Sequence, residues 1–100
     1  MSQDLIKRYA VTLNNHKQKG RVDFTTVQVP DGLRHKESWT VTIKFTYARN
    51  ADNEEVAPFF EVGHGATKGK ALTAASFLAL RTLGYIPPNT HEPESEGEIS

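Results

Sequence analysis

The residues best suited to chemistry lie in the segment from Gly63 to Ala71, which reads Gly-His-Gly-Ala-Thr-Lys-Gly-Lys-Ala. A nucleotide phosphate loop needs four residues between its glycines and then Lys before Ser or Thr. Here Gly65 and Gly69 enclose three residues, and Lys70 precedes an alanine. Lys68 stands where the dinucleotide fingerprint needs its third glycine. The segment therefore predicts a flexible glycine turn that leads into a helix, and not a nucleotide-hydrolysing site.

The start of this helix is a candidate anion site. Thr67 is the predicted N-cap, and Lys68 and Lys70 fall in the first turn. Free amide groups and the helix dipole both favour negative charge there, whereas lysines are unfavourable for the isolated helix. A bound phosphate would explain both lysines, and ordinary surface solubility is the competing explanation.

Other reactive groups do not form a recognisable site in the sequence. Cysteine is absent, and no cluster of carboxylates accompanies the histidines. Neither Ser38 nor Ser76 has the neighbours of an activated nucleophile. We therefore expect no enzymatic activity, no metal, no cofactor and no small-molecule substrate. The four histidines are His16, His35, His64 and His91. They lack the spacing of metal ligands.

Length and composition predict one globular domain. The chain has 100 residues, 37% of them hydrophobic, and twelve basic residues balance twelve acidic ones. The charges are segregated, because residues 1–49 hold nine Lys or Arg against four acids, whereas residues 83–100 hold four glutamates and no base. No apolar run spans a membrane, and the start lacks the features of a signal peptide. We expect an intracellular protein, cytoplasmic or nuclear, without a membrane partner.

Hydrophobic periodicity predicts an α+β fold in the order α-β-β-β-α. The expected helices are residues 4–16 and 67–83, and the expected strands are 22–29, 38–48 and 56–62. A change of apolar phase between Phe24 and Val27 predicts a bulge or a twist, and Pro58 predicts an edge strand or the start of one. The domain should cover residues 1–86, followed by a disordered acidic tail over residues 87–100.

The strand at 38–48 alternates clearly between apolar and polar residues, so its apolar face should meet both helices across a three-stranded antiparallel sheet. One side of the second helix should carry its small and apolar residues: Ala71, Ala74, Ala75, Leu78 and Thr82. The predicted core is Trp39, Val41, Ile43 and Phe45 together with Phe24, Tyr9, Leu13 and Leu78.

Two motifs in this order resemble the double-stranded RNA-binding domain family. The first is residues 32–41, Gly-Leu-Arg-His-Lys-Glu-Ser-Trp-Thr-Val, which is similar to the turn and second strand of that family. The second is residues 63–68, Gly-His-Gly-Ala-Thr-Lys, which looks like the glycine turn, capping hydroxyl and lysine that open the last helix of the family. The resemblance covers residues 4–85.

The resemblance implies a non-catalytic module that binds RNA duplexes by shape, across two minor grooves and the phosphates between them. The first helix would reach one minor groove, the loop with His35 would enter the other, and the second helix would hold phosphates. Arg8 stands where the family commonly has glutamate, so a phosphate contact is expected from it. The implied RNA-binding residues are Lys7, Arg8, Thr12, Asn15, Arg34, His35, Lys36, Thr67, Lys68 and Lys70.

A second interpretation stays open: a degenerate domain of the same fold that contacts a protein partner or a second copy. Leu72 stands where the family has a lysine, and the loop at residues 50–55 and the tail are acidic.

Overall fold

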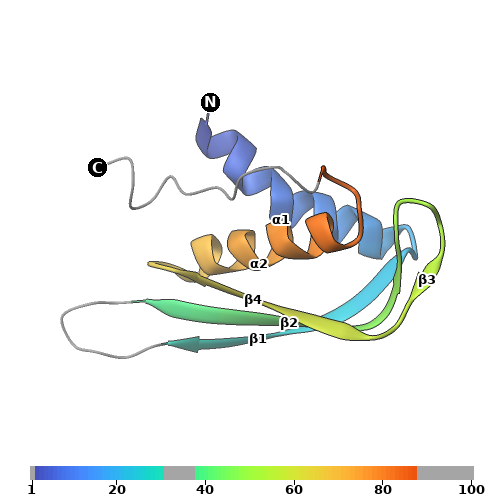
Figure 1. Ribbon diagram of the computed structural model, residues 1–100. Coiled ribbons are helices and arrows are strands. Elements are labelled where there is room, and N and C mark those ends of the chain that lie inside the picture. Colours follow the sequence, from blue (N-terminus) through green and yellow to red (C-terminus); the bar gives the residue numbers. More distant parts are fainter. Residues whose placement is uncertain (1, 31–37, 88–100) are drawn as a thin grey trace.

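The helices and strands follow one another in the order that the hydrophobic pattern predicts. In a computed structural model of the chain, the described residues are 2–30 and 38–87, with side chains described from Tyr9 onward. Two helices lie on the same face of one antiparallel sheet, so the α+β prediction is confirmed (Figure 1). The elements are α1 (Ser2–Gln18), β1 (Val22–Pro30), β2 (Trp39–Arg49), β3 (Glu55–Val56), β4 (Phe59–Gly65) and α2 (Lys68–Thr82). No helix within this part of the chain is both long and apolar enough to span a membrane.

β2 is the central strand of the sheet. β1 pairs with one side of β2 over its whole length, and β4 pairs with the other side from Trp39 to Phe45. The predicted strand at 56–62 is wrong in its bounds, because it is divided into β3 and a longer β4 that runs on to Gly65 (Figure 1). The break falls at Ala57 and Pro58, since proline has no N–H to donate to a neighbouring strand.

The predicted irregularity in the first strand lies one step earlier than expected. Asp23 pairs with Tyr47 and Phe24 with Phe45, so Thr46 is the extra residue of a bulge in β2. Beyond it, Val27 and Val29 share a face with Thr42 and Thr40 of β2, away from the helices. The apolar phase of β1 therefore changes because its second half turns its valines outward.

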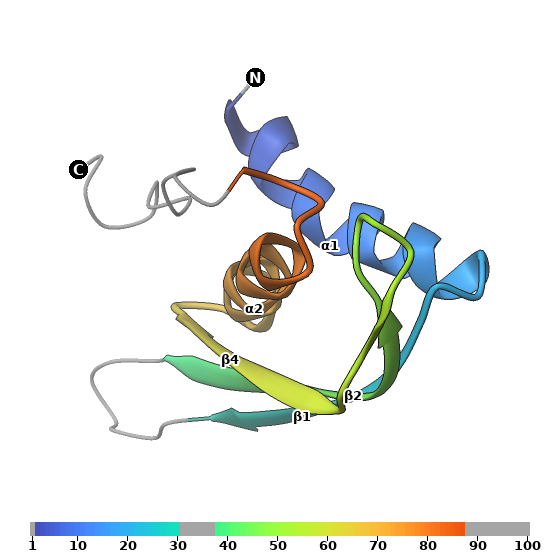
Figure 2. The same ribbon diagram turned by 45° about the vertical axis from the view of Figure 1, so that its right-hand side comes forward.

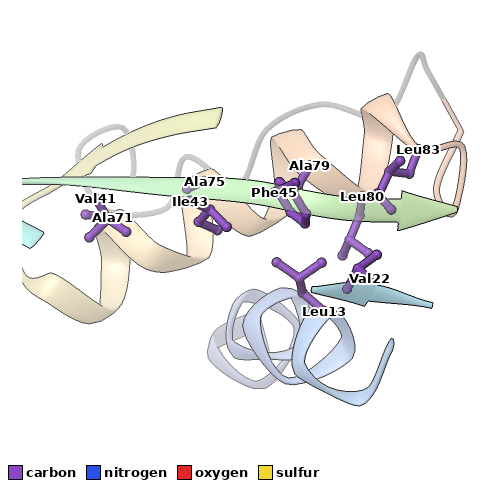
Figure 3. Packing of buried hydrophobic residues seen from close by; sticks show 11 residues of the cluster. Leu13, Val22, Val41, Ile43, Phe45, Ala71, Ala75, Ala79, Leu80 and Leu83 are labelled. Atoms are coloured by element: carbon purple, nitrogen blue, oxygen red, sulfur yellow. The ribbon is translucent and has the colours of Figure 1, made fainter. Parts of the chain in front are cut away.

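The core lies between β2 and the two helices. Val41, Ile43 and Phe45 of β2 are buried as predicted, and they meet the row Ala71, Ala75 and Ala79 of α2 (Figure 3). Leu13 joins Val22 and Leu80 at the other end of the cluster. Three predicted core residues, Tyr9, Phe24 and Trp39, are partly buried and pack against it.

The predicted face of α2 is partly wrong. Leu78 and Ala74 are only half-buried and Thr82 is exposed, whereas Phe77 and Leu80 are fully buried. Phe77 packs edge-on against Tyr9 of α1, with the ring centroids 5.1 Å apart. α2 contacts both the sheet and α1, so it is buried around more of its circumference than the single apolar stripe of a surface helix would be.

Two glycines of β4 allow α2 to approach the sheet closely. A Cβ at Gly63 would overlap the backbone nitrogen of Ala75 and the backbone oxygen of Ala71. A Cβ at Gly65 would lie 2.6 Å from the Ala71 nitrogen. The glycine segment is therefore mostly strand, which corrects the predicted flexible turn, and its glycines are needed for the close approach of a helix backbone.

The last turn of α1 is attached to the segment that follows α2. The His16 and Tyr85 rings stack with centroids 4.1 Å apart, and the Tyr85 hydroxyl donates to the Arg49 carbonyl at 2.6 Å. Burial lowers the pKa of His16, and the positive charges of Arg21 and Lys19 lower it further. Burial also raises the pKa of Tyr85, an effect that Arg21 opposes. The neutral imidazole is therefore the form that this contact favours.

We predict that Gly63→Ala lowers the free energy of unfolding by about 3 kcal/mol or more, because α2 must move away from β4. The matched control is Gly69→Ala, where the nearest atom is the Thr67 hydroxyl at 3.9 Å. That change should stabilise the helix by about 0.5 to 1 kcal/mol. Urea unfolding of both variants measures the difference, and a shift of both in the same direction would contradict the close approach.

We also predict that stability falls on acidification below pH 6.5 in part through His16. Its pKa is lower in the folded than in the unfolded chain, so the unfolded chain takes up a proton first as the pH drops. His16→Phe keeps an aromatic ring beside Tyr85 and removes the titration. Its melting temperature should fall less than that of the parent between pH 7.5 and 5.5, and equal falls would show that His16 does not contribute.

Candidate functional site

The first turn of α2 presents a cationic helix N-terminus. Thr67 is extended, with φ −133° and ψ 164°, and its hydroxyl accepts a hydrogen bond from the Lys70 N–H at 3.1 Å. The predicted N-cap is thereby confirmed. Lys68, Gly69 and Lys70 are exposed, and this turn holds no acidic residue. Two ammonium groups and the free end of the helix dipole therefore add to one local positive field.

Lys68 is positioned by an aromatic ring of the sheet. Its ammonium nitrogen lies 5.1 Å from the centroid of the Trp39 ring, within the range of a cation–π contact. Trp39 is the first residue of β2, and it pairs with Gly65, the last residue of β4. Only Ala66 and Thr67 separate Gly65 from the start of α2. This contact was not predicted, because Trp39 and Lys68 lie far apart in the sequence. The alternation of β2 also assigns Trp39 to the core.

Four elements implicated by the sequence have one end each on the same side of the molecule. The first turn of α2, the start of α1 and the paired ends of β1 and β2 all lie toward the left of Figure 1. Pro30 pairs with Trp39 there, and Trp39 contacts Lys68. The predicted residues Arg34, His35 and Lys36 belong to the segment that joins these strands, which lies outside the described residues.

Along its described part, α1 exposes one valine, three side-chain amides and Lys17. Asn15 is exposed as expected for a contact residue, whereas Thr12 is half-buried. The exposed row is Val11, Asn14, Asn15 and Gln18. Lys7 and Arg8 belong to α1, and their side chains lie outside the described part of the chain.

Lys17 has a structural role at the end of α1. Its ammonium group donates to the Phe24 carbonyl at 2.9 Å and lies 4.6 Å from the centroid of the Phe24 ring. It also lies 4.0 Å from the Asp23 carboxylate. Lys17 thus attaches α1 to β1, and sequence reasoning gave no sign of these contacts.

His64 points away from the candidate site, although it stands between the two glycines. Its Nδ1 lies 3.0 Å from the Thr40 hydroxyl, and the two residues are cross-strand partners. Successive residues of a strand alternate between the faces, so His64 lies on the sheet face opposite α2, while Gly63 and Gly65 face the helix.

Within residues 2–30 and 38–87, no group of three or more His, Asp or Glu side chains is placed to hold a metal ion. Comparison of the chain with protein-family models, with curated proteins and with solved structures gives no match.

We predict that Thr67→Ala lowers the free energy of unfolding by about 1 kcal/mol, because the Lys70 N–H loses its acceptor. Thr67→Ser retains a hydroxyl at the N-cap and should unfold at nearly the urea concentration of the parent. If serine were as destabilising as alanine, the methyl group of Thr67 and not its hydroxyl would be the stabilising group.

Proposed function

We propose that the chain is a non-catalytic module that binds double-stranded RNA by shape. The observation that carries this proposal is the first turn of α2, where Thr67 caps the helix, Lys68 and Lys70 stand exposed, and the turn itself holds no acidic residue. The partner we infer belongs inside the cell, in the cytoplasm or the nucleus.

The chemistry of α2 suits phosphate better than a base edge. Free amide groups at a helix start, together with two ammonium groups, bind phosphate oxygens and do not discriminate between bases. The balanced charge of the whole chain is compatible with this site, because phosphate binding depends on the local field. Lys68 is also held near Trp39, which limits the conformational freedom that binding would remove.

The other two proposed contacts, from α1 and from the segment with His35, are with the minor grooves of the duplex. Their 2′-hydroxyls both donate and accept hydrogen bonds, and side-chain amides can do the same. Asn14, Asn15 and Gln18 supply such amides on the exposed row of α1. In the proposal, the segment with Arg34, His35 and Lys36 reaches the second groove.

A second candidate function, contact with a protein, is favoured by apolar side chains on the free face of the sheet. Phe60 of β4 is 65% exposed, and Val27 and Val29 of β1 are 42% and 48% exposed. These residues lie on the face opposite the helices, so a protein contact there would be separate from the proposed RNA contacts.

We predict that Lys68→Ala and Lys70→Ala each weaken binding to RNA duplexes of any sequence. Each should also reduce the magnitude of the log–log salt slope by roughly 0.9 per lost phosphate contact, on the scale measured for B-DNA. Titration of a duplex at two or more salt concentrations measures both effects.

The matched control is Lys44→Ala, which removes the same charge from the sheet face opposite α2. It should leave the salt slope unchanged. If the double variant at Lys68 and Lys70 kept the slope of the parent, these lysines would not contact the duplex.

A further inference from the structure

β1 is an edge strand whose outer side has no partner among the described residues. The stretch from Thr25 to Val29 is exposed and uncharged. Natural edges usually carry charges, prolines or interruptions that prevent pairing with another chain. The opposite edge has such features, since Pro58 interrupts it and Glu55 and Glu61 lie along it.

Hydrogen bonds show which backbone groups of β1 face outward. The carbonyls of Arg21 and Asp23 point to β2, where they accept from the Arg49 N–H at 2.8 Å and the Thr46 hydroxyl at 3.3 Å. The Phe24 carbonyl instead accepts from Lys17 of α1. Because these directions alternate along a strand, the backbone groups of Thr26, Gln28 and Pro30 face the free edge.

We propose that β1 pairs antiparallel with β1 of a second copy of this chain, with the two-fold axis at Val27. In this register Thr26 and the partner's Gln28 exchange two hydrogen bonds, and the symmetric pair exchanges two more. Phe24 then lies opposite the partner's Pro30. Proline has no N–H to donate, and the Phe24 carbonyl needs none because Lys17 already occupies it.

The neighbouring registers leave backbone groups without partners or in competition. With the axis at Gln28, the Thr26 carbonyl would face the partner's Pro30 and would lack a donor. With the axis at Thr26, the Gln28 N–H would compete with the partner's Lys17 for one Phe24 carbonyl. The edge is therefore complementary to itself in one register, which favours a second copy over an unrelated segment.

Side chains support the same register. Val27 would face the partner's Val27 in a non-hydrogen-bonded pair, where opposite side chains lie closest. Val29 would face the partner's Thr25, and none of the paired residues from Phe24 to Pro30 carries a charge. The pairing would cover both valines of β1 that are exposed in the single chain.

Sedimentation equilibrium of the full chain, without RNA, tests the proposal. The parent should show a concentration-dependent dimer, and Val27→Lys should lose it, since two ammonium groups would meet at the axis. The matched control is Val11→Lys, the same change at a valine of α1 that is 57% exposed, and it should dimerise like the parent. Val27→Glu alone should be monomeric, and its mixture with Val27→Lys should form the dimer again.

Oxidative cross-linking tests the register, because the natural chain has no cysteine. Val27→Cys should form a linked dimer, since non-hydrogen-bonded partners lie about 4.5 Å apart at Cα, within disulfide range. Val29→Cys should link much more slowly because it faces a threonine. A parent that stays monomeric, a dimer that survives Val27→Lys, or faster linking at Val29 would each overturn the proposal. A monomeric parent would leave the edge to a strand of another protein.

Discussion

The close approach of α2 to β4 is the constraint on which the arrangement of this molecule depends. Because Gly63 and Gly65 lack side chains, the backbone of α2 at Ala71 and Ala75 lies directly on the sheet. The helix then buries small residues against β2 and still reaches α1 with Phe77. The same contact fixes where α2 lies on the sheet, and with it the place of the cationic first turn that Thr67 caps.

The two edge strands of the sheet differ in how well they are protected. The helices cover β4 and not the second half of β1, and Pro58 interrupts only the edge formed by β3 and β4. α2 lies over β4 and β2, and α1 reaches β1 only near its beginning, where Lys17 contacts Phe24 (Figure 2). The second half of β1 is thus left without a helix above it. The proposed phosphate contacts lie on α2 and the proposed self-pairing on the outer side of β1, so each can be altered by substitutions that leave the other in place.

Element type and order could be predicted from sequence because they follow from periodicity, as in the alternation of β2 and the Thr67 cap of α2. The buried face of α2 could not, because its rotation depends on contacts with two other elements. Pro58 does lie directly before β4, as the predicted strand start requires, but the division into two strands and the role of Gly63 were not predicted. A glycine indicates a turn or a close approach equally well until the neighbouring helix is placed. For the candidate site, the sequence supplied the lysines of α2 but not the ring that holds Lys68.

That ring has an optical consequence. Trp39 is the only tryptophan of the chain, and a lysine ammonium lies over its face. Indole emission responds to nearby charge, so any ligand that draws Lys68 away from the ring alters the fluorescence of the unlabelled protein. Emission from the tyrosines can be excluded by exciting at a wavelength that only the indole absorbs. The protein thus contains an intrinsic fluorophore adjacent to the helix start, and occupancy of that position can be followed without a dye.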